Sequence, residues 1–305
     1  MLVLTAILAS AGDRDPVYRG CVEECTVGCG QTLRPTWSSI GWSCASDCEY
    51  GCMHARNAER LALGRATLQY NGKWPFVRVL GMQEACAVAF SLANLAAHAS
   101  GLRRSWSALR AAGRRRAVWR EFGVLAVHGW AWAALFHARD LRWTERGDYF
   151  SAILFILAGL FTAVLHVLDA SGVRNAVLVW LLRALCAGVF AAHARTMTRS
   201  FDYGRHMLIS FALGAVHALT WVAWWTRARR TSATAWRGVA LNALAYASAA
   251  FELLDFPPIL GLLDAHALWH ASTAPLGHLL WVYFVEVDGV PPDDQTAALV
   301  RELTI

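Results

Sequence analysis

Apolar residues gather in seven stretches that follow one another along most of the chain. In order, they cover residues 79–99, 118–138, 148–169, 174–194, 205–225, 237–254 and 264–286. Each stretch is close to the ~20 residues that an α-helix needs to cross a bilayer. The sixth stretch ends just before Pro257 and Pro258, which cannot continue a helix. The pattern therefore predicts an all-α membrane protein, built as a seven-transmembrane-helix bundle.

The composition supports this fold class. Of the 305 residues, 56% are hydrophobic and only 16% are charged, and the mean hydropathy is +0.35. Soluble domains carry about a quarter charged residues. This composition excludes a disordered chain and argues against an ordinary cytosolic enzyme.

The positive charge of the chain is almost entirely arginine, because Lys73 is the single lysine in a chain of net charge +6. Arginines cluster between the first and second stretches, over residues 103–120, and again over residues 227–237. The positive-inside rule places both segments in the cytoplasm. The N-terminal region is then luminal and residues 288–305 form a cytoplasmic tail. Few aromatic residues interleave these arginines, so we expect no nucleic-acid partner.

Residues 1–77 differ from the rest of the chain. Residues 1–11 are apolar and end in small residues, which is typical of a signal peptide, although a buried N-terminal strand is the alternative. Residues 12–77 are polar and hold six of the eight cysteines. We therefore expect a small luminal Cys-rich helical domain at 12–77, followed by a transmembrane domain at 78–287.

The six N-terminal cysteines form two copies of a C-x3-C-x3-C pattern, which puts three thiols on one face of each of two helices. Six cysteines allow 15 pairings. An antiparallel hairpin favours the nested set Cys21–Cys52, Cys25–Cys48 and Cys29–Cys44, and zinc binding is the rival interpretation. Cys86 and Cys186 lie within apolar stretches, where packing explains them.

The chemistry-bearing residues fall at the predicted luminal ends of the helices. His266 and His270 are four residues apart on one helical face, which is a metal-chelating spacing. His137 ends the second stretch and Asp148 opens the third, so the topology brings all four to one depth. Three histidines with an open fourth position are typical of a catalytic zinc site. The other histidines are scattered singly, and packing is the better interpretation for them.

Five segments carry a resemblance to a known family: GDRDPVYRGCVEEC, NGKWPFVRVLGMQEA, RDLRWTERGDYF, RSFDYG and FELLDFPPILGLLDAHALWHAST. They are similar to the GPI-remodelling phospholipases, a family that resembles the CREST superfamily of seven-helix membrane hydrolases. The resemblance spans about residues 12–285. It implies that His137, His266 and His270 hold Zn²⁺ and that Asp148 acts with them. It further implies a phospholipase A2 that removes the sn-2 acyl chain from GPI-anchored proteins in the ER or Golgi membrane.

One position departs from that pattern. The superfamily has Ser one turn before the first histidine, where this chain has Ala133. Three interpretations are open: another donor such as Ser151 or Thr273, a weakened enzyme, or a deliberate replacement. The missing hydroxyl makes a lipid-binding receptor the first rival function, and the paired transmembrane histidines make a haem-binding electron carrier the second.

Five further polar positions resemble the family more weakly. Gln83, Glu84 and Asn94 are interpreted as buried packing residues, and Asp255 and Asp264 as partners that orient the histidines or, for Asp264, as a helix N-cap.

Overall fold

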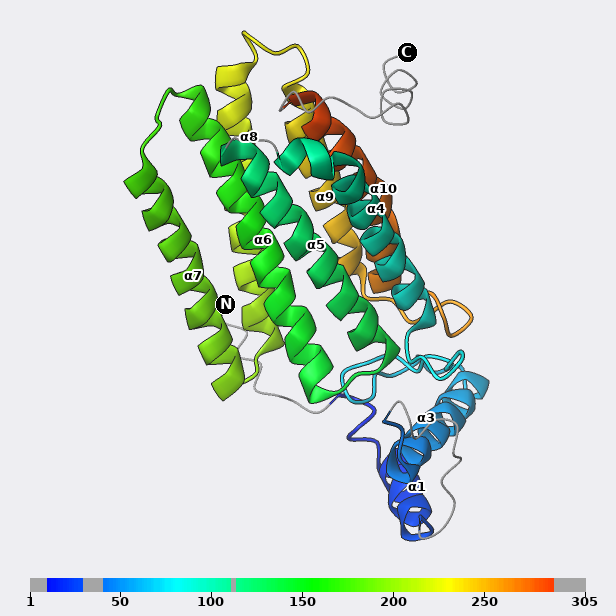
Figure 1. The fold of residues 1–305 in the computed structure, drawn as a ribbon. Helices are drawn as coiled ribbons and strands as arrows, with labels where there is room; N and C mark the ends of the chain where they lie inside the picture. The colour runs from blue at the N-terminus through cyan, green and yellow to red at the C-terminus, as the bar shows by residue number, and fades with distance from the viewer. Residues whose placement is uncertain (1–9, 30–40, 111–113, 288–305) are drawn as a thin grey trace, which may run out of the picture.

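The computed structural model describes residues 10–29, 41–110 and 114–287. The regular elements in this part of the chain are helices, and the connecting segments hold three isolated β-bridges. In the described residues, helices of 12 and 19 residues precede seven helices of 19 to 29 residues. Figure 1 shows their arrangement. Their bounds are α1 (Pro16–Val27), α3 (Cys44–Ala62), α4 (Ala85–Arg110), α5 (Arg114–Ala138), α6 (Arg142–Ala170), α7 (Ala176–Arg199), α8 (Tyr203–Ala228), α9 (Trp236–Leu254) and α10 (Ala265–Val287). The prediction of an all-α protein is confirmed for the described residues.

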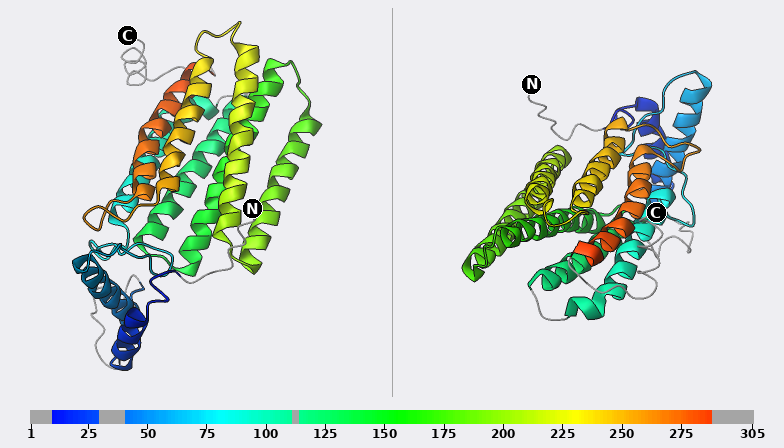
Figure 2. Two further views of the ribbon diagram at one scale, coloured as in Figure 1. Left: turned by 180° about the vertical axis from the view of Figure 1, so that it is seen from behind. Right: turned by 90° about the horizontal axis from the view of Figure 1, so that it is seen from above.

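The seven long helices run roughly side by side in one bundle (Figures 1 and 2). Helix α4 packs between α5 and α10, while α6 packs against α5 and α8. Helix α7 lies at the outer edge, against α6. Four of the helices, α4, α6, α7 and α8, are long and apolar enough to cross a membrane. The chain is therefore a membrane protein, and a full set of seven crossings stays a prediction.

The helix ends differ from the expected ones in three places. Helix α4 begins at Ala85 rather than near residue 79, because Val79 and Met82 close a tight turn in front of it. Helix α6 begins at Arg142, where the Thr144 hydroxyl accepts the Leu141 amide at 2.8 Å, so Asp148 lies in the second turn. Most of the expected cytoplasmic loop at 103–120 is helical. The expected tail at 288–305 and residues 1–9 of the expected signal peptide lie outside the described residues.

Glycines let the bundle close around one tryptophan. The Trp281 side chain of α10 is 2% exposed. A Cβ on Gly101 of α4 would lie 2.1 Å from the Trp281 ring, and one on Gly123 of α5 would lie 2.7 Å from it. No larger residue fits at either position, so three helices converge on this indole.

The Cys-rich domain is a helical hairpin of α1 and α3. Disulfides join Cys21 to Cys52, Cys25 to Cys48 and Cys29 to Cys44, with Cα–Cα distances of 5.7–5.8 Å. These are the nested pairs that the spacing favours. Each of the six sulfur atoms is bonded to one partner in a disulfide, so the rival zinc interpretation does not describe these cysteines.

Stacked aromatic and guanidinium groups attach this domain to the bundle. The Trp42 ring lies between the guanidinium of Arg78, 3.3 Å from its centroid, and that of Arg139, 3.7 Å away. Arg139 follows α5 directly and also donates to the Gly41 carbonyl. The Trp42 indole donates to the Gly81 carbonyl at 2.9 Å. The domain is therefore fixed against the end of the bundle at which α5 ends.

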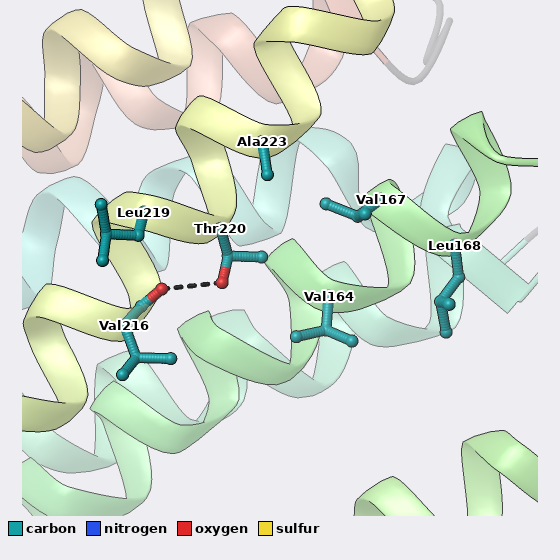
Figure 3. A pocket seen from close by; sticks show the side chains of 7 residues that line it. All are labelled: Val164, Val167, Leu168, Val216, Leu219, Thr220 and Ala223. Carbon is teal, nitrogen blue, oxygen red and sulfur yellow. Dashed lines mark hydrogen bonds between the residues drawn. The ribbon is translucent and has the colours of Figure 1, made fainter.

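An apolar groove of about 330 Å³ runs between α6 and α8 (Figure 3). Its one hydroxyl, on Thr220, donates to the Val216 carbonyl of its own helix at 2.7 Å. The lining, which includes Val164 and Leu168, holds no ionisable group. This groove therefore supplies no side chain for acid–base or metal chemistry.

Candidate metal centre

Three imidazoles converge where α5 ends and α10 begins. His137 lies in the last turn of α5, and His266 and His270 lie one turn apart near the start of α10. The Nε2 atom of His266 is 3.3 Å from that of His137 and 2.9 Å from that of His270. His137 and His270 are 2% and 3% exposed, while the His266 side chain is 29% exposed. The cluster is thus buried on two sides and open beside His266.

Each histidine is held through its other ring nitrogen. His137 Nδ1 donates to Oε2 of Glu84 at 2.7 Å, and His266 Nδ1 donates to Oε2 of Glu252 at 2.6 Å. His270 Nδ1 lies 3.0 Å from the hydroxyl of Ser91, which is fully buried on α4. A hydrogen bond at Nδ1 fixes the ring orientation and turns the Nε2 lone pair toward the shared centre.

The donor set fits a metal ion. A proton on Nδ1 of both His137 and His266 leaves their facing Nε2 atoms as bare lone pairs, which repel each other at 3.3 Å. A cation between them removes this repulsion. The ligand atoms of the three histidines all lie within 4.8 Å of one another. Imidazole nitrogens suit zinc, and three protein ligands leave one coordination position open.

A second layer of charge surrounds Glu84. Its Oε1 forms an ion pair with Lys73, whose Nζ also lies 3.3 Å from Asp140 and 4.2 Å from the centre of the Phe136 ring. Burial alone would lower the pKa of Lys73, but the carboxylates of Glu84 and Asp140 raise it above its usual value. The only lysine of the chain therefore stays protonated and anchors the carboxylate that orients His137.

Asp148 and Ala133 occupy different parts of this region. Asp148 is half-buried on α6 and lies close enough to His266 for an electrostatic interaction. Ala133 is 6% exposed on α5, one turn before His137. Of the alternative donors, the Thr273 hydroxyl donates a hydrogen bond to the His270 carbonyl at 3.0 Å, and Ser151 is buried on α6.

Comparison with known proteins identifies the family. The Per1-like family matches residues 36–288. This chain belongs to the Per1-like family. The GPI-specific phospholipase A2-like PGAP3 of Xenopus laevis is 35% identical over 93% of this chain and 92% of its own length. The human protein of the same name is 33% identical over 95% and 93%, and the PER1 homolog of Schizosaccharomyces pombe is 34% identical over 92% and 87%. No solved structure matches the chain.

In this Per1-like chain, carboxylates other than the expected ones orient the histidines. Asp264 accepts the Ala267 amide at 2.8 Å, so it caps α10. Asp255 accepts the Trp74 indole and the Gln69 amide, and thereby ties the Cys-rich domain to the end of α9. The interpretation of Asp255 as a histidine partner is wrong, since neither of these hydrogen bonds goes to a histidine. Glu84 and Glu252 take that role.

The sequence contains a feature that marks each of these two glutamates as a candidate for the site. Glu252 is a carboxylate inside an apolar stretch, and an ionisable residue in such a place is a functional candidate by default. Glu84, Ser91 and Asn94 are seven and three residues apart, which puts them on one face of the helix. Ser91 lies against the His270 ring and Asn94 donates to the His270 carbonyl at 2.8 Å, so these two residues of α4 hold both the ring and the backbone of His270.

Proposed function

We propose that this chain is a zinc-dependent GPI-specific phospholipase A2 that removes the sn-2 acyl chain of GPI anchors during fatty-acid remodelling. The observation that carries the proposal is the set of three convergent Nε2 atoms, each on a ring held at Nδ1, with a fourth position left open. A site closed by four protein ligands would favour a structural role instead. The relatives named GPI-specific phospholipase A2-like PGAP3 support a lipase that acts on GPI anchors.

The residues divide the work between binding and proton transfer. His137, His266 and His270 would hold the zinc, which when bound supplies Lewis acidity toward an ester carbonyl and toward water. Asp148 accepts the proton of the attacking water and returns it to the leaving alcohol. Its half-buried position on α6, within electrostatic range of His266, supports this role. Glu84 and Glu252 keep the imidazoles in the tautomer that presents Nε2.

The proposed topology suits a GPI substrate. Seven crossings with a luminal N-terminal domain and a cytoplasmic tail put the metal centre at the luminal edge of the ER or Golgi membrane. The domain boundaries we propose are 12–77 and 78–287. A GPI anchor carries its glycan in the lumen and its ester bonds just inside the bilayer, so GPI-anchored proteins and membrane phospholipid are the substrates we expect at this depth.

Ala133 favours one second candidate, a catalytically weakened relative or lipid-binding receptor. A methyl group cannot donate a hydrogen bond to a developing oxyanion or to a carboxylate. Removing one oxyanion donor costs roughly 100- to 1,000-fold in rate. A chain with the metal centre intact and this hydroxyl missing would bind lipid and turn it over slowly.

Acyl release tests the proposal. The purified full chain, loaded with zinc in nanodiscs, is given a GPI lipid labelled in its sn-2 acyl chain, and an sn-1-labelled lipid serves as the control. We expect labelled fatty acid from the sn-2 substrate alone and faster release by the Ala133→Ser variant. Release by that variant only would establish the weakened relative. No release by either zinc-loaded protein, or release from the sn-1 position, would overturn the proposal.

A further inference from the structure

Three tight turns near the metal centre share a pair of consecutive residues with positive φ, although the third turn is one residue longer than the other two. Bridges between Tyr70 and Lys73, between Val79 and Met82, and between Ile259 and Leu263 close them. In each turn, the residue after the first bridge partner has a positive φ and is followed by a glycine with a positive φ. These pairs are Asn71 (50°) with Gly72 (77°), Leu80 (51°) with Gly81 (78°), and Leu260 (55°) with Gly261 (73°).

Two of these turns have leucine at the position where a turn in water favours asparagine or glycine. Asn and Gly adopt the left-handed region readily, and Asn-Gly is the preferred pair for such a turn in water. Leucine rarely adopts it, because its Cβ crowds the backbone. The chain has the favourable Asn at position 71 and the unfavourable Leu at positions 80 and 260. Backbone preference therefore does not explain why leucine occupies these two positions.

Packing inside the protein does not explain them either. Leu80 is 80% exposed and Leu260 is 89% exposed, the highest value among its neighbours in the turn. Ile259 beside it is 56% exposed. Residues 256–263, FPPILGLL, contain no charged or polar side chain. A strained backbone that presents apolar side chains outward needs an apolar partner outside the protein.

The two leucine turns form one surface. The amide of Val77 donates to the Gly261 carbonyl at 2.8 Å, and a Cβ on Gly261 would lie 2.7 Å from the Val77 side chain. Both loops lie at the same end of the bundle, beside the ends of α4 and α10 (Figure 1). One turn leads directly to Glu84 and the other to His266. The surface therefore borders the metal centre.

We propose that the Leu80–Gly81 and Leu260–Gly261 turns are a lipid-contacting edge that dips into the leaflet next to the metal centre. Bilayer lipid is the occupant that the position supports, because α4, which starts just after Leu80, is apolar enough to cross the membrane. The turns then lie where that crossing meets the bilayer surface. Burial of the leucine side chains in lipid offsets the free-energy cost of the left-handed backbone conformation. Leucine side chains exposed to water would not offset this cost. This contact does not depend on hydrolytic activity.

Site-specific photo-cross-linking tests the edge, and Asn71 supplies the matched control. Three full-length variants carry p-benzoylphenylalanine in place of Leu80, Leu260 or Asn71, each in phosphatidylcholine nanodiscs. All three positions are exposed and have a positive φ, so the substitutions disturb no packed core. After irradiation, mass spectrometry measures the fraction of each peptide that carries a phosphatidylcholine adduct.

We expect lipid adducts at positions 80 and 260 with at least about tenfold higher yield than at position 71, since the polar Asn71–Gly72 turn is hydrogen-bonded to Asp13 of the Cys-rich domain and to Ser10. Equal yields at the three positions, or no lipid adduct at 80 and 260, would overturn the proposal. Cross-links from position 80 or 260 to a second protein molecule in place of lipid would overturn it as well. These outcomes are read without any acyl release, so they are separate from the test of the hydrolase.

Discussion

The Glu252→Gln variant tests whether the carboxylates set the ring state of the histidines. Glu252 accepts two hydrogen bonds, from His266 Nδ1 at 2.6 Å and from the Tyr203 hydroxyl at 2.6 Å, one on each oxygen. A glutamine has one acceptor oxygen and one NH₂ group. The glutamine oxygen can accept a hydrogen bond from only one of the two donors, His266 Nδ1 or the Tyr203 hydroxyl. Where the NH₂ group faces His266, the imidazole must carry its proton on Nε2, the atom that would bind the metal.

The expected magnitude follows from the lost hydrogen bond. A hydrogen bond to a charged group contributes about 1.5–3 kcal/mol, and every ~1.4 kcal/mol changes a dissociation constant tenfold. We expect zinc to bind Glu252→Gln about 10- to 100-fold more weakly, in the range typical of changes to residues that support metal ligands. Tyr203→Phe leaves the carboxylate in place, so we expect a loss of less than about tenfold.

Competition with a chelator of known affinity, on purified protein, measures these constants. Glu121→Gln is the matched control, because Glu121 also lies on a bundle helix but pairs with Arg183 at 2.8 Å, away from the histidines. An affinity for zinc in Glu252→Gln equal to that of the control would refute the role of Glu252. A loss of the same size in both variants would point to general destabilisation instead.

Three more outcomes are expected. Asp148→Asn should keep zinc at wild-type stoichiometry and lower the acyl-release rate about 100- to 10,000-fold, because an amide cannot accept a proton. Loss of zinc from this variant would contradict the role of Asp148 in proton transfer. Cys25→Ser with Cys48→Ser should destabilise the Cys-rich domain by about 2–4 kcal/mol, seen as faster limited proteolysis of residues 12–77 with the bundle intact. A glycosylation acceptor inserted at residues 111–113 should stay unmodified in microsomes, while one inserted at residues 64–65 is modified; the reverse pattern would refute the topology.

Periodic patterns in the sequence predict the scaffold well. The apolar stretches indicate the seven long helices because each apolar run is about one membrane thickness long, and runs of this kind have few alternative folds. The three disulfides follow from a spacing of four in two helices, which permits only one nested antiparallel pairing. The histidine pair follows from the same helical periodicity.

The partners of the histidines were harder to predict because they come from other helices. Glu84 lies just before α4, Ser91 lies on α4 and Glu252 lies on α9, each more than a dozen residues from the ring that it orients. A single sequence shows that a carboxylate sits in an apolar stretch but not which imidazole it faces. The predicted start of the first membrane helix, near residue 79, was wrong because hydropathy does not show turn geometry. Residues 79–82 continue the apolar run, but Gly81 has a positive φ and lies in a turn rather than in a helix.

Zinc-edge X-ray absorption on the purified full chain tests the metal centre most directly. We expect one zinc per chain with three imidazole nitrogens and one further light atom at roughly 2.0–2.1 Å. The His266→Ala, His270→Ala double variant should lose most of the zinc and keep its helical content, since packed helices around Trp281 do not depend on the metal. Zinc retained at wild-type stoichiometry in that double variant, or sulfur ligands in the wild-type spectrum, would contradict a metal centre built on these three histidines.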